Sequence, residues 1–279
     1  GQAPPRGRLP ALPTALRKDG TMRIMSCNIR YSAAQDGVNA WPHRREYAAE
    51  VIRSREPDVV CFQEMSREQY LFLRRRLADY DAVAMVDTPT GQSPQNAIFW
   101  RREGFALVSS GGYWLSETPH IAGTKSWDSN NIRLANWVRL AIAGSGLEIR
   151  VIGTHLDHRG QTAREQQARL INEDAAVYPI DYPQFLCGDM NATIDNPAIA
   201  AFLAGGWVDT YGTLPDAPDP GNTFHNFRGP AYDQPVGKID WIFCRGRVRP
   251  VGAEIVRDAC EGRYPSDHYF IAADVEFPS

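Results

Sequence analysis

Residues 185–191 read Phe-Leu-Cys-Gly-Asp-Met-Asn, and they show the pattern that organises the chain. Phe185 to Cys187 form a short apolar run typical of a buried strand, and an acid and an amide follow at its end. Asp189 and Asn191 are two positions apart, so their side chains face the same side of an extended chain. Taken alone, these residues are explained equally well by a Gly-Asp turn that ends in an Asn cap.

The same pattern, an apolar run followed by polar side chains, occurs at other places along the chain. If the fold brings these strand ends together, they form one pocket with four carboxylates, two carboxamides and two imidazoles. Such a pocket suits a hard divalent cation and a phosphate ester, and it therefore indicates a phosphoesterase. The other stretches are Ser26-Cys27-Asn28, Gln63-Glu64, Thr154-His155, Ile239-Asp240 and Ser266-Asp267-His268.

Strand-like and helical segments follow one another along residues 21–279, with roughly a dozen strands in all by their apolar periodicity. This mixture predicts an α/β fold of two packed sheets covered by helices. Gly144-Ser145-Gly146 predicts a hairpin, and Gly111-Gly112 predicts a break in a strand at 106–115. Long polar loops at 87–96 and 116–132 are places where sites tend to be assembled. The expected helices lie at 41–55, 67–77, 161–177 and 197–204.

The charge balance argues against a protein that binds long nucleic acids. The 279 residues contain 30 Lys plus Arg and 33 Asp plus Glu, which gives a formal charge of -3. A protein that neutralises many phosphates usually carries a basic face, so no extended duplex partner is expected. Basic clusters at 44–45, 74–76 and 245–249 are interpreted as solvated helix faces and turn ends.

The cysteines indicate buried thiols rather than disulfides or a zinc site. Four of the five (Cys27, Cys61, Cys187 and Cys244) lie inside apolar runs, and only Cys260 is expected in a loop. None has C-x-x-C spacing, so zinc held by thiolates is not expected.

Residues 1–20 are expected to form a disordered lead-in to a single catalytic domain at 21–279. The first sixteen residues are rich in Pro, Ala and Leu and have no acidic residue. They are consistent with a precursor whose signal peptide has been removed, so an exported or periplasmic protein is expected, with a cytoplasmic one as the alternative. No apolar run approaches the roughly 20 residues that span a bilayer. We expect a monomer.

The polar residues at the strand ends suggest specific roles in phosphoester hydrolysis. The carboxylate of Asp189 can orient and deprotonate a water, while Asn191 donates to a phosphate oxygen. If Asp240 accepts a proton from one nitrogen of His268, the other nitrogen is fixed to face the phosphate. Asp267 points the opposite way along its strand and can reach a metal or the attacking water.

Further polar residues complete this predicted site. Oxygens of Asn28 and Glu64 suit Mg²⁺ or Mn²⁺, which keep several waters and bind phosphate directly. His155 or His158 can hydrogen-bond a phosphate oxygen or the leaving group, with His155 the better candidate. Each residue alone is as well explained as a cap or a hydrogen-bonded core residue, and only their recurrence favours a site.

The ordered motifs resemble the endonuclease/exonuclease/phosphatase superfamily over about residues 21 to 277. They are Ser-Cys-Asn-Ile, Phe-Gln-Glu, Gly-Thr-His-Leu, Gly-Asp-Met-Asn, Lys-Ile-Asp-Trp-Ile and Tyr-Pro-Ser-Asp-His. The resemblance implies a four-layer sandwich of two mixed sheets between helices, and one or two Mg²⁺ or Mn²⁺ ions.

The resemblance also implies roles for individual residues. It places Asn28, Glu64 and Asp267 around the metal and makes Asp189 the residue that activates the nucleophile. The remaining members of the implied site are Asn191, which positions the nucleophile, and His155 and His268, which stabilise the phosphate, with Asp240 orienting His268.

Within the superfamily, three stretches resemble a bacterial group near the deadenylase branch, whose members are often exported. In such a protein Arg133, Trp41 and Trp114 can line the pocket mouth, where rings stack on bases or sugars and Arg binds phosphate. Core packing is an equal alternative for each Trp. The stretches are residues 36–45, 113–119 and 154–160.

The sequence therefore predicts a Mg²⁺- or Mn²⁺-dependent phosphoester hydrolase. The expected substrate is a small sugar-phosphate-like or nucleotide-like molecule, and the alternative is a 3′-5′ exonuclease on single-stranded RNA or DNA. A protein that kept the fold but lost catalysis is the alternative of another class.

Overall fold

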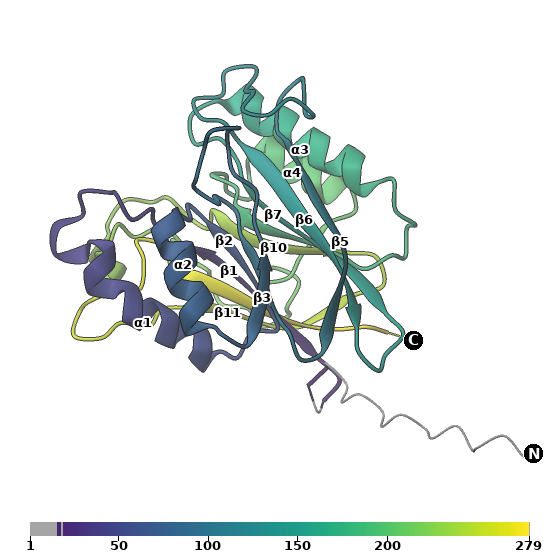
Figure 1. Cartoon of the computed structure of the whole chain (residues 1–279), viewed down its shortest axis with the longest axis horizontal. Coiled ribbons are helices and arrows are strands. Elements are labelled where there is room, and N and C mark those ends of the chain that lie inside the picture. Colours follow the sequence, from purple (N-terminus) through teal and green to yellow (C-terminus); the bar gives the residue numbers. More distant parts are fainter. Residues whose placement is uncertain (1–15, 18, 279) are drawn as a thin grey trace, which may run out of the picture.

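The computed structural model describes residues 16–17 and 19–278, and its centre is two packed six-stranded sheets (Figure 1). In both sheets one pair of strands is parallel, β1 with β2 and β7 with β8, and the other pairs are antiparallel. The first sheet has the order β11 (Arg249–Val256), β12 (Phe270–Glu276), β1 (Met22–Asn28), β2 (Val59–Gln63), β4 (Ile98–Arg101) and β3 (Tyr80–Val83). The second has the order β5 (Phe105–Trp114), β6 (Leu134–Ile142), β7 (Glu148–His155), β8 (Gln184–Asp189), β10 (Asp240–Arg245) and β9 (Val208–Asp209).

Helices cover the outer faces of the two sheets, which makes four layers. Helices α1 (Trp41–Ser54) and α2 (Arg67–Arg76) lie on one side, and α3 (Gln161–Ala175) and α4 (Pro197–Ala204) lie on the other (Figure 1). This architecture confirms the predicted α/β sandwich of two mixed sheets flanked by helices.

The central strands read as continuous apolar runs because both of their faces are buried. In β1, Ile24 packs into the core between the sheets, while its neighbour Met25 packs into the core beneath α1 and α2. In β8, Phe185 and Leu186 divide in the same way between the inner core and the core beneath α3 and α4. Strands buried on both faces lose the alternation of apolar and polar residues.

Two helices begin where the sequence predicts, because their first turns are capped. Ser66 and Gln69 form a capping box at the start of α2. The side chain of Asn196 accepts from the Ala198 amide at 3.0 Å at the start of α4, where Pro197 occupies the first turn.

Two expected features of the strands are wrong. The pair Gly111-Gly112 does not break β5: a Cβ at Gly111 would lie 2.7 Å from the Trp137 ring, and one at Gly112 would lie 2.2 Å from the Met85 sulfur. These glycines allow close packing, and the irregularity in β5 falls between Leu107 and Ser109. The strand expected at 207–211 is also shorter, because only Val208–Asp209 pairs with β10.

Arg44 is buried, and the interpretation of residues 44–45 as a solvated helix face is wrong for it. Its side chain is in α1 and donates to backbone carbonyls within residues 29–39 and at Pro265, segments that are far apart in the sequence. Burial lowers the pKa of Arg44 to about 10, partly offset by Asp267. The hydrogen bonds run to the carbonyls of Asn39 at 2.9 Å and of Ile29, Arg30 and Pro265, each at 2.8 Å.

We predict that Arg44→Met destabilises the protein by about 3–5 kcal/mol, because the substitution leaves these buried carbonyls unpaired. For a chain of this size the thermal midpoint falls by about 6–15 °C, measurable by calorimetry or circular dichroism. Arg75→Ala, at an exposed position on α2, is the matched control and shifts the midpoint by less than about 2 °C. Equal midpoints for the two variants would contradict a structural role for Arg44.

The segment before β1 is described in part, and the cysteines have the states that the sequence predicts. Residues 1–15 and 18 of the expected lead-in lie outside the described residues, whereas Arg17 donates to the carbonyl of Glu56 at 2.9 Å. In the described part of the chain no helix combines the length and the apolar character that crossing a membrane requires. The five cysteines are free: Cys27, Cys61, Cys187 and Cys244 are buried and Cys260 is exposed.

Candidate active site

The register of three neighbouring strands sets three of the predicted residues in a row. His155 at the end of β7 pairs with Asp189 at the end of the parallel strand β8, and Asp189 pairs with Asp240 at the start of the antiparallel strand β10. Gly188 is required here because a Cβ at this position would lie 2.2 Å from the carbonyl oxygen of Thr154. Backbone pairing alone therefore brings together residues that are 34 to 85 positions apart (189 − 155 and 240 − 155).

The first sheet supplies the opposite side of the site through its own parallel pair. Asn28 at the end of β1 pairs with Gln63 at the end of β2, so Glu64 directly follows this edge. Glu64 has φ of 59°, and Arg30 and Asn191 are also left-handed, at 53° and 47°. Such backbones cost about 1–3 kcal/mol each in non-glycine residues and cluster at functional sites.

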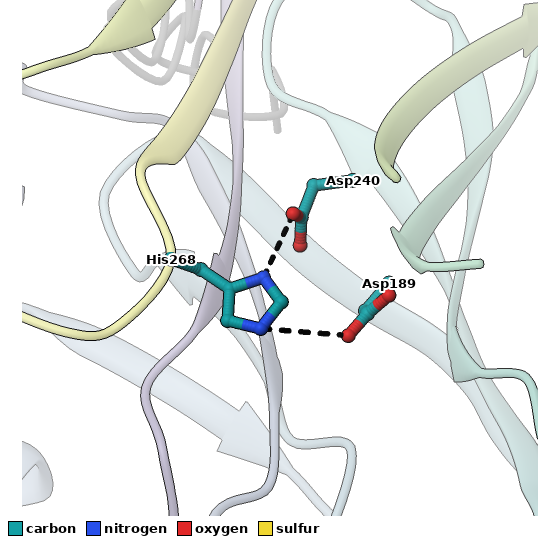
Figure 2. A group of neighbouring side chains, drawn as sticks. All are labelled: Asp189, Asp240 and His268. Atoms are coloured by element: carbon teal, nitrogen blue, oxygen red, sulfur yellow. Dashed lines mark hydrogen bonds and ion pairs between the residues drawn. The ribbon is translucent and has the colours of Figure 1, made fainter. Parts of the chain in front are cut away.

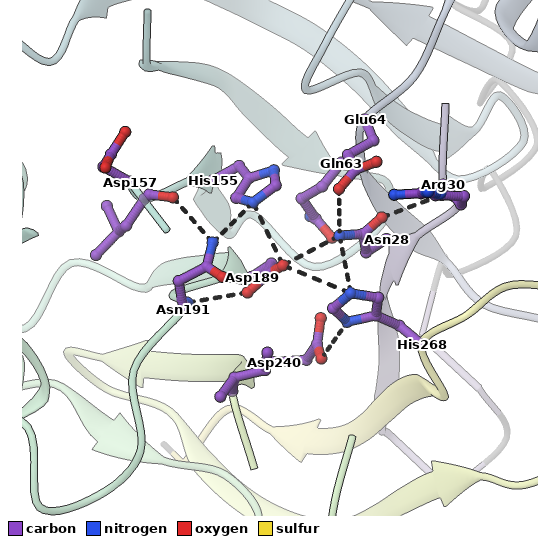
Figure 3. A network of polar contacts seen from close by, with 12 residues as sticks. Asn28, Arg30, Gln63, Glu64, His155, Asp157, Asp189, Asn191, Asp240 and His268 are labelled. Atoms are coloured by element: carbon purple, nitrogen blue, oxygen red, sulfur yellow. Dashed lines mark hydrogen bonds and ion pairs between the residues drawn. The ribbon is translucent and has the colours of Figure 1, made fainter. Parts of the chain in front are cut away.

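Asn28 joins the two halves of the site. Its amide nitrogen donates to Glu64 Oε1 at 3.2 Å and to Asp189 Oδ2 at 3.0 Å, and lies 3.4 Å from His268 Nε2 (Figure 3). One amide group thus contacts residues from both sheets that are far apart in the sequence. The predicted convergence of the strand ends is confirmed.

His268 lies between two carboxylates (Figure 2). Its Nδ1 is 2.9 Å from Asp240 Oδ2, and its Nε2 is 3.8 Å from Asp189 Oδ2. Burial acts to lower the pKa of His268, but Asp240 and then Asp189 outweigh it and raise the pKa to about 10. The imidazole is therefore held in one orientation and favours its charged form.

Asp189 occupies the centre of this network. It accepts from the Asn191 backbone amide at 2.9 Å, and its Oδ2 lies 3.3 Å from His155 Nε2. Burial, together with the nearby charge of Asp240, raises the pKa of Asp189 to about 7. A carboxylate with a pKa near neutrality is suited to accept a proton from water.

Asn191 reaches the site by a turn rather than along an extended strand. β8 ends at Asp189, and the side-chain nitrogen of Asn191 lies 2.9 Å from His155 Nε2 and 3.1 Å from the carbonyl oxygen of Leu156. Burial, with Arg133 nearby, lowers the pKa of His155 well below its usual value. His155 is thus neutral while His268 favours a charge.

The network opens into a cavity of about 1040 Å³. This volume is at the upper end of the range for small-molecule sites. Of the predicted residues, Asn28 and Asp240 lie behind the cavity wall, where they are 1% exposed. The predicted residues that line the cavity are Glu64, Arg133, His155, His158, Asp189, Asn191, Asp267 and His268.

The structure does not bring Trp41 or Trp114 to the cavity, which corrects the expectation that they line its mouth. Trp41 is 1% exposed and packs with α1 and α2, with the Phe72 ring at 5.7 Å. Trp114 does not line the cavity, although its indole nitrogen donates at 2.7 Å to the carbonyl of Asp87, which does. Core packing, the alternative for Trp41, is the correct explanation.

The donor set of the site fits a hard divalent cation. Glu64 and Asp267 face the cavity, and burial and the charge of Glu64 raise the pKa of Asp267. His268 lowers the pKa of Asp267 more than Glu64 raises it, and Arg30, whose Nε is 3.6 Å from Asp267 Oδ2, lowers it further, so burial is the main cause of the raised pKa. A cation bound by the carboxylate oxygens would offset this cost of burying a charged group.

A compact group of two carboxylates and an imidazole lies deeper in the site. Among the described residues, Asp189, Asp240 and His268 form the group whose possible ligand atoms all lie within 4.8 Å of one another. Two of its members, Asp240 and His268, already bond to each other at 2.9 Å. Asn28, predicted near the metal, directs its oxygen to the Arg30 amide at 3.1 Å.

Several residues at the site were not expected from the sequence. Arg30 follows Asn28 by two residues and lines the cavity next to Asp267. Other lining residues come from the two long polar loops, which the sequence marks by their length. These loops contribute Asp87, Ser93, Gln95, Lys125, Asn130, Asn131 and Ile132.

Comparison with known proteins gives relatives of several kinds. A solved structure from Bacteroides vulgatus, an endonuclease/exonuclease/phosphatase, is 31% identical, with a TM-score of 0.85 over 92% of this chain and 99% of that chain. A mannosyl-6-phosphatase from Bacteroides thetaiotaomicron is 25% identical, with a TM-score of 0.82 over 92% of this chain and 100% of that chain. Nocturnin of Drosophila melanogaster is 26% identical over 280 residues, 85% of this chain. The match takes in only 42% of Nocturnin, so this chain spans less than half the length of that relative.

The family match covers the whole of the site. Residues 25–268 match the endonuclease/exonuclease/phosphatase family, from within β1 to His268. Together with the two packed sheets, this match shows that the chain belongs to the endonuclease/exonuclease/phosphatase family of phosphoester hydrolases.

Proposed function

We propose that the protein is a Mg²⁺- or Mn²⁺-dependent hydrolase that removes or cleaves a phosphate ester of a small molecule, either sugar-phosphate-like or nucleotide-like. The observation that carries this proposal is the Asn28 amide, which contacts Glu64, Asp189 and His268 at one end of a large cavity. At this end of the cavity, carboxylates are available to bind a cation and to accept a proton from water. An imidazole is available to contact the phosphate.

In this proposal Asp189 is the general base. Its Oδ1 is held by the Asn191 amide and its Oδ2 by Asn28, so the carboxylate has a fixed direction toward the cavity. It orients a water for attack on phosphorus and takes the proton from that water. Glu64 and Asp267 would hold the divalent metal, which supplies Lewis-acid stabilisation of charge on the phosphate when bound.

Two imidazoles and an amide complete the proposed site. Asp240 holds Nδ1 of His268, so that Nε2 faces the cavity and stabilises a phosphate oxygen. His155 is neutral and next to Asn191, and both line the cavity where a phosphate oxygen or the leaving group would lie. His158 and Arg133 line the same cavity and extend the set of groups that can contact phosphate.

The charges around the cavity favour a small substrate over a polynucleotide. Arg30, Lys125 and Arg133 line it together with four carboxylates, so the described lining has no excess of cations that would track a phosphate backbone. The carboxylates are those of Glu64, Asp87, Asp189 and Asp267. A 3′-5′ exonuclease on single-stranded RNA or DNA is the rival outcome of the experiment below.

The test is phosphate release from a panel of esters with Mg²⁺, Mn²⁺ or a chelator, run beside an oligoribonucleotide ladder. We expect turnover of sugar phosphates or nucleotides that a chelator abolishes and that added Mg²⁺ or Mn²⁺ restores, because the acids need the cation to bind phosphate. Activity on a small ester should change only a few-fold between 50 and 200 mM salt, whereas a polyanion substrate loses about 10³ or more.

Two results would oppose this proposal. Degradation of the ladder with the small esters untouched would favour the exonuclease. Turnover that persists after extensive treatment with a chelator would rule out the metal.

A further inference from the structure

One wall of the cavity carries polar side chains that the proposed chemistry does not use, next to Arg133, which is among the groups that can contact phosphate. This wall is formed by residues 130–133, which we call the amide segment, and Lys125, Ser93 and Gln95 also line the cavity. The side chains of Asn130 and Asn131 are exposed in the cavity, and no part of the proposed reaction uses them.

The amide segment is held in place by one buried carboxylate, that of Asp157. This side chain is completely buried, and burial acts to raise its pKa, but hydrogen bonds from backbone amides lower the pKa to about 2. One oxygen accepts from the Asn130 amide at 2.9 Å, the Asn131 amide at 3.0 Å and the Ser129 hydroxyl at 3.1 Å. The other accepts from the amides of Arg159 at 2.9 Å and Gly160 at 2.8 Å.

Asp157 therefore fixes the amide segment relative to the chemistry. It lies two residues after His155, so it fixes the wall directly to the end of β7. Arg133, at the other end of the segment, has an 11% exposed side chain, and its Nε is 4.0 Å from Asp157. The segment is thus ordered before any ligand arrives, which lowers the entropic cost of binding.

The chemistry of this wall suits hydroxyl groups better than a nucleobase. Amide, hydroxyl and ammonium groups offer donors and acceptors that pair with the hydroxyls of a sugar. Tyr31 and Phe224 are the aromatic side chains among the described lining residues, and the Phe224 ring already packs against His268 at 5.0 Å. The wall therefore lacks the pair of free rings that would sandwich a base.

We propose that the amide segment, positioned by Asp157, is the subsite for the leaving group and that it selects a hydroxyl-rich alcohol such as a sugar. The inference rests on the proposed function, because it concerns the alcohol portion of the same ester. Asn130 and Asn131 contact the hydroxyls of that alcohol, and Asp157 is a positioning residue that does not touch it.

The first test compares esters that differ only in the alcohol: a hexose 6-phosphate, adenosine monophosphate and para-nitrophenyl phosphate. In the double variant Asn130→Ala/Asn131→Ala we expect the ratio of kcat/KM for the hexose phosphate to that for the aryl phosphate to fall at least tenfold. The control is Gln166→Ala on α3, outside the cavity lining, which leaves the ratio unchanged. An equal loss for all three esters, or a larger loss for the nucleotide, would overturn the proposal.

The second test examines the positioning role. We expect Asp157→Asn to raise KM for the hexose phosphate at least fivefold while kcat changes less. The side-chain NH2 group that replaces one oxygen cannot accept the hydrogen bonds from the Asn130 and Asn131 backbone amides. A purely structural defect would instead lower kcat for every ester in parallel with the loss of folded protein, which circular dichroism reports.

A binding measurement separates this inference from the proposed function. Calorimetric titration of hexose 6-phosphate into Asp189→Asn with Mg²⁺ should show binding that Asn130→Ala/Asn131→Ala weakens at least tenfold. Equal binding with and without these two substitutions, or no binding at all, would refute the subsite. Failure of the wild-type protein to hydrolyse any ester of the panel would refute the proposed function alone.

Discussion

Replacing Asp189 by Asn should lower kcat by about 10³, because an amide cannot accept the proton from the attacking water. The substitution keeps the size of the side chain, and its one oxygen can accept either the bond that Asn28 gives to Oδ2 or the bond that the Asn191 amide gives to Oδ1. The measurement is the initial rate of phosphate release with saturating Mg²⁺. Asp195→Asn, an exposed neighbour on the same loop, is the matched control and should retain wild-type turnover.

The same substitution should stabilise the metal-free protein above neutral pH. The pKa of Asp189 is raised in the folded state to about 7, so the folded protein holds this proton more tightly than the unfolded chain. The resulting stabilisation is complete below about pH 4 and is lost as the pH rises to about 7. Asparagine does not titrate, so Asp189→Asn should lack this loss and unfold at a higher temperature at pH 8 in the presence of a chelator.

Together the two measurements distinguish a lost catalytic group from a damaged fold. An inactive variant with a raised melting temperature agrees with the role of Asp189 as a base. Turnover equal to that of the wild type would instead contradict the role of Asp189 as the base. Inactivity with a lowered melting temperature would show that Asp189 matters for folding.

His268→Ala should lower kcat by about 10²–10³, the typical cost of removing one donor to a charged oxygen of the transition state. Asp240→Asn should also lower kcat, because the Asp240 carboxylate holds His268 Nδ1 at 2.9 Å and keeps Nε2 toward the cavity. The measurement is kcat for an aryl phosphate and an alkyl phosphate. His120→Ala, at an exposed position, is the control.

The two esters define the role of His268. If it stabilises oxygens of the phosphate, the loss is similar for aryl and alkyl esters, because both share the same phosphate. If it protonated the leaving group, the alkyl ester would lose far more than the aryl ester, whose leaving group needs no proton. A loss confined to the alkyl ester would therefore contradict the proposed role.

The catalytic end of the cavity was predictable because its residues are fixed by strand periodicity and backbone pairing. Asp189 and His155 each follow a run of apolar residues buried on both faces, and parallel neighbours end at the same edge of a sheet. Asn28 and Glu64 come together for the same reason in the first sheet. Such pairing depends on local pattern, which a sequence displays directly.

Side chains whose surroundings come from distant segments were not predictable in the same way. Arg44 belongs to a pair of arginines typical of an exposed helix face, yet it bonds the Pro265 carbonyl from the other end of the chain. Trp41 is an aromatic residue of the kind that often lines binding sites, but it packs in the core beneath α1 and α2. The conformation of the amide segment depends on Asp157, a contact across about 26 residues (157 − 131) that no local pattern reveals.

The row of His155, Asp189 and Asp240 across β7, β8 and β10 has a consequence for engineering. Side chains alternate along a strand, so inserting a single residue into β8 would turn Asp189 to the opposite face of the sheet. Loops that only present side chains to the ligand are under no such constraint. A mutant library seeking new specificities should therefore leave the ladder intact and randomise residues 87–95. In the amide segment only the side chains of Asn130 and Asn131 should be varied, at constant length, because their backbone amides bond Asp157.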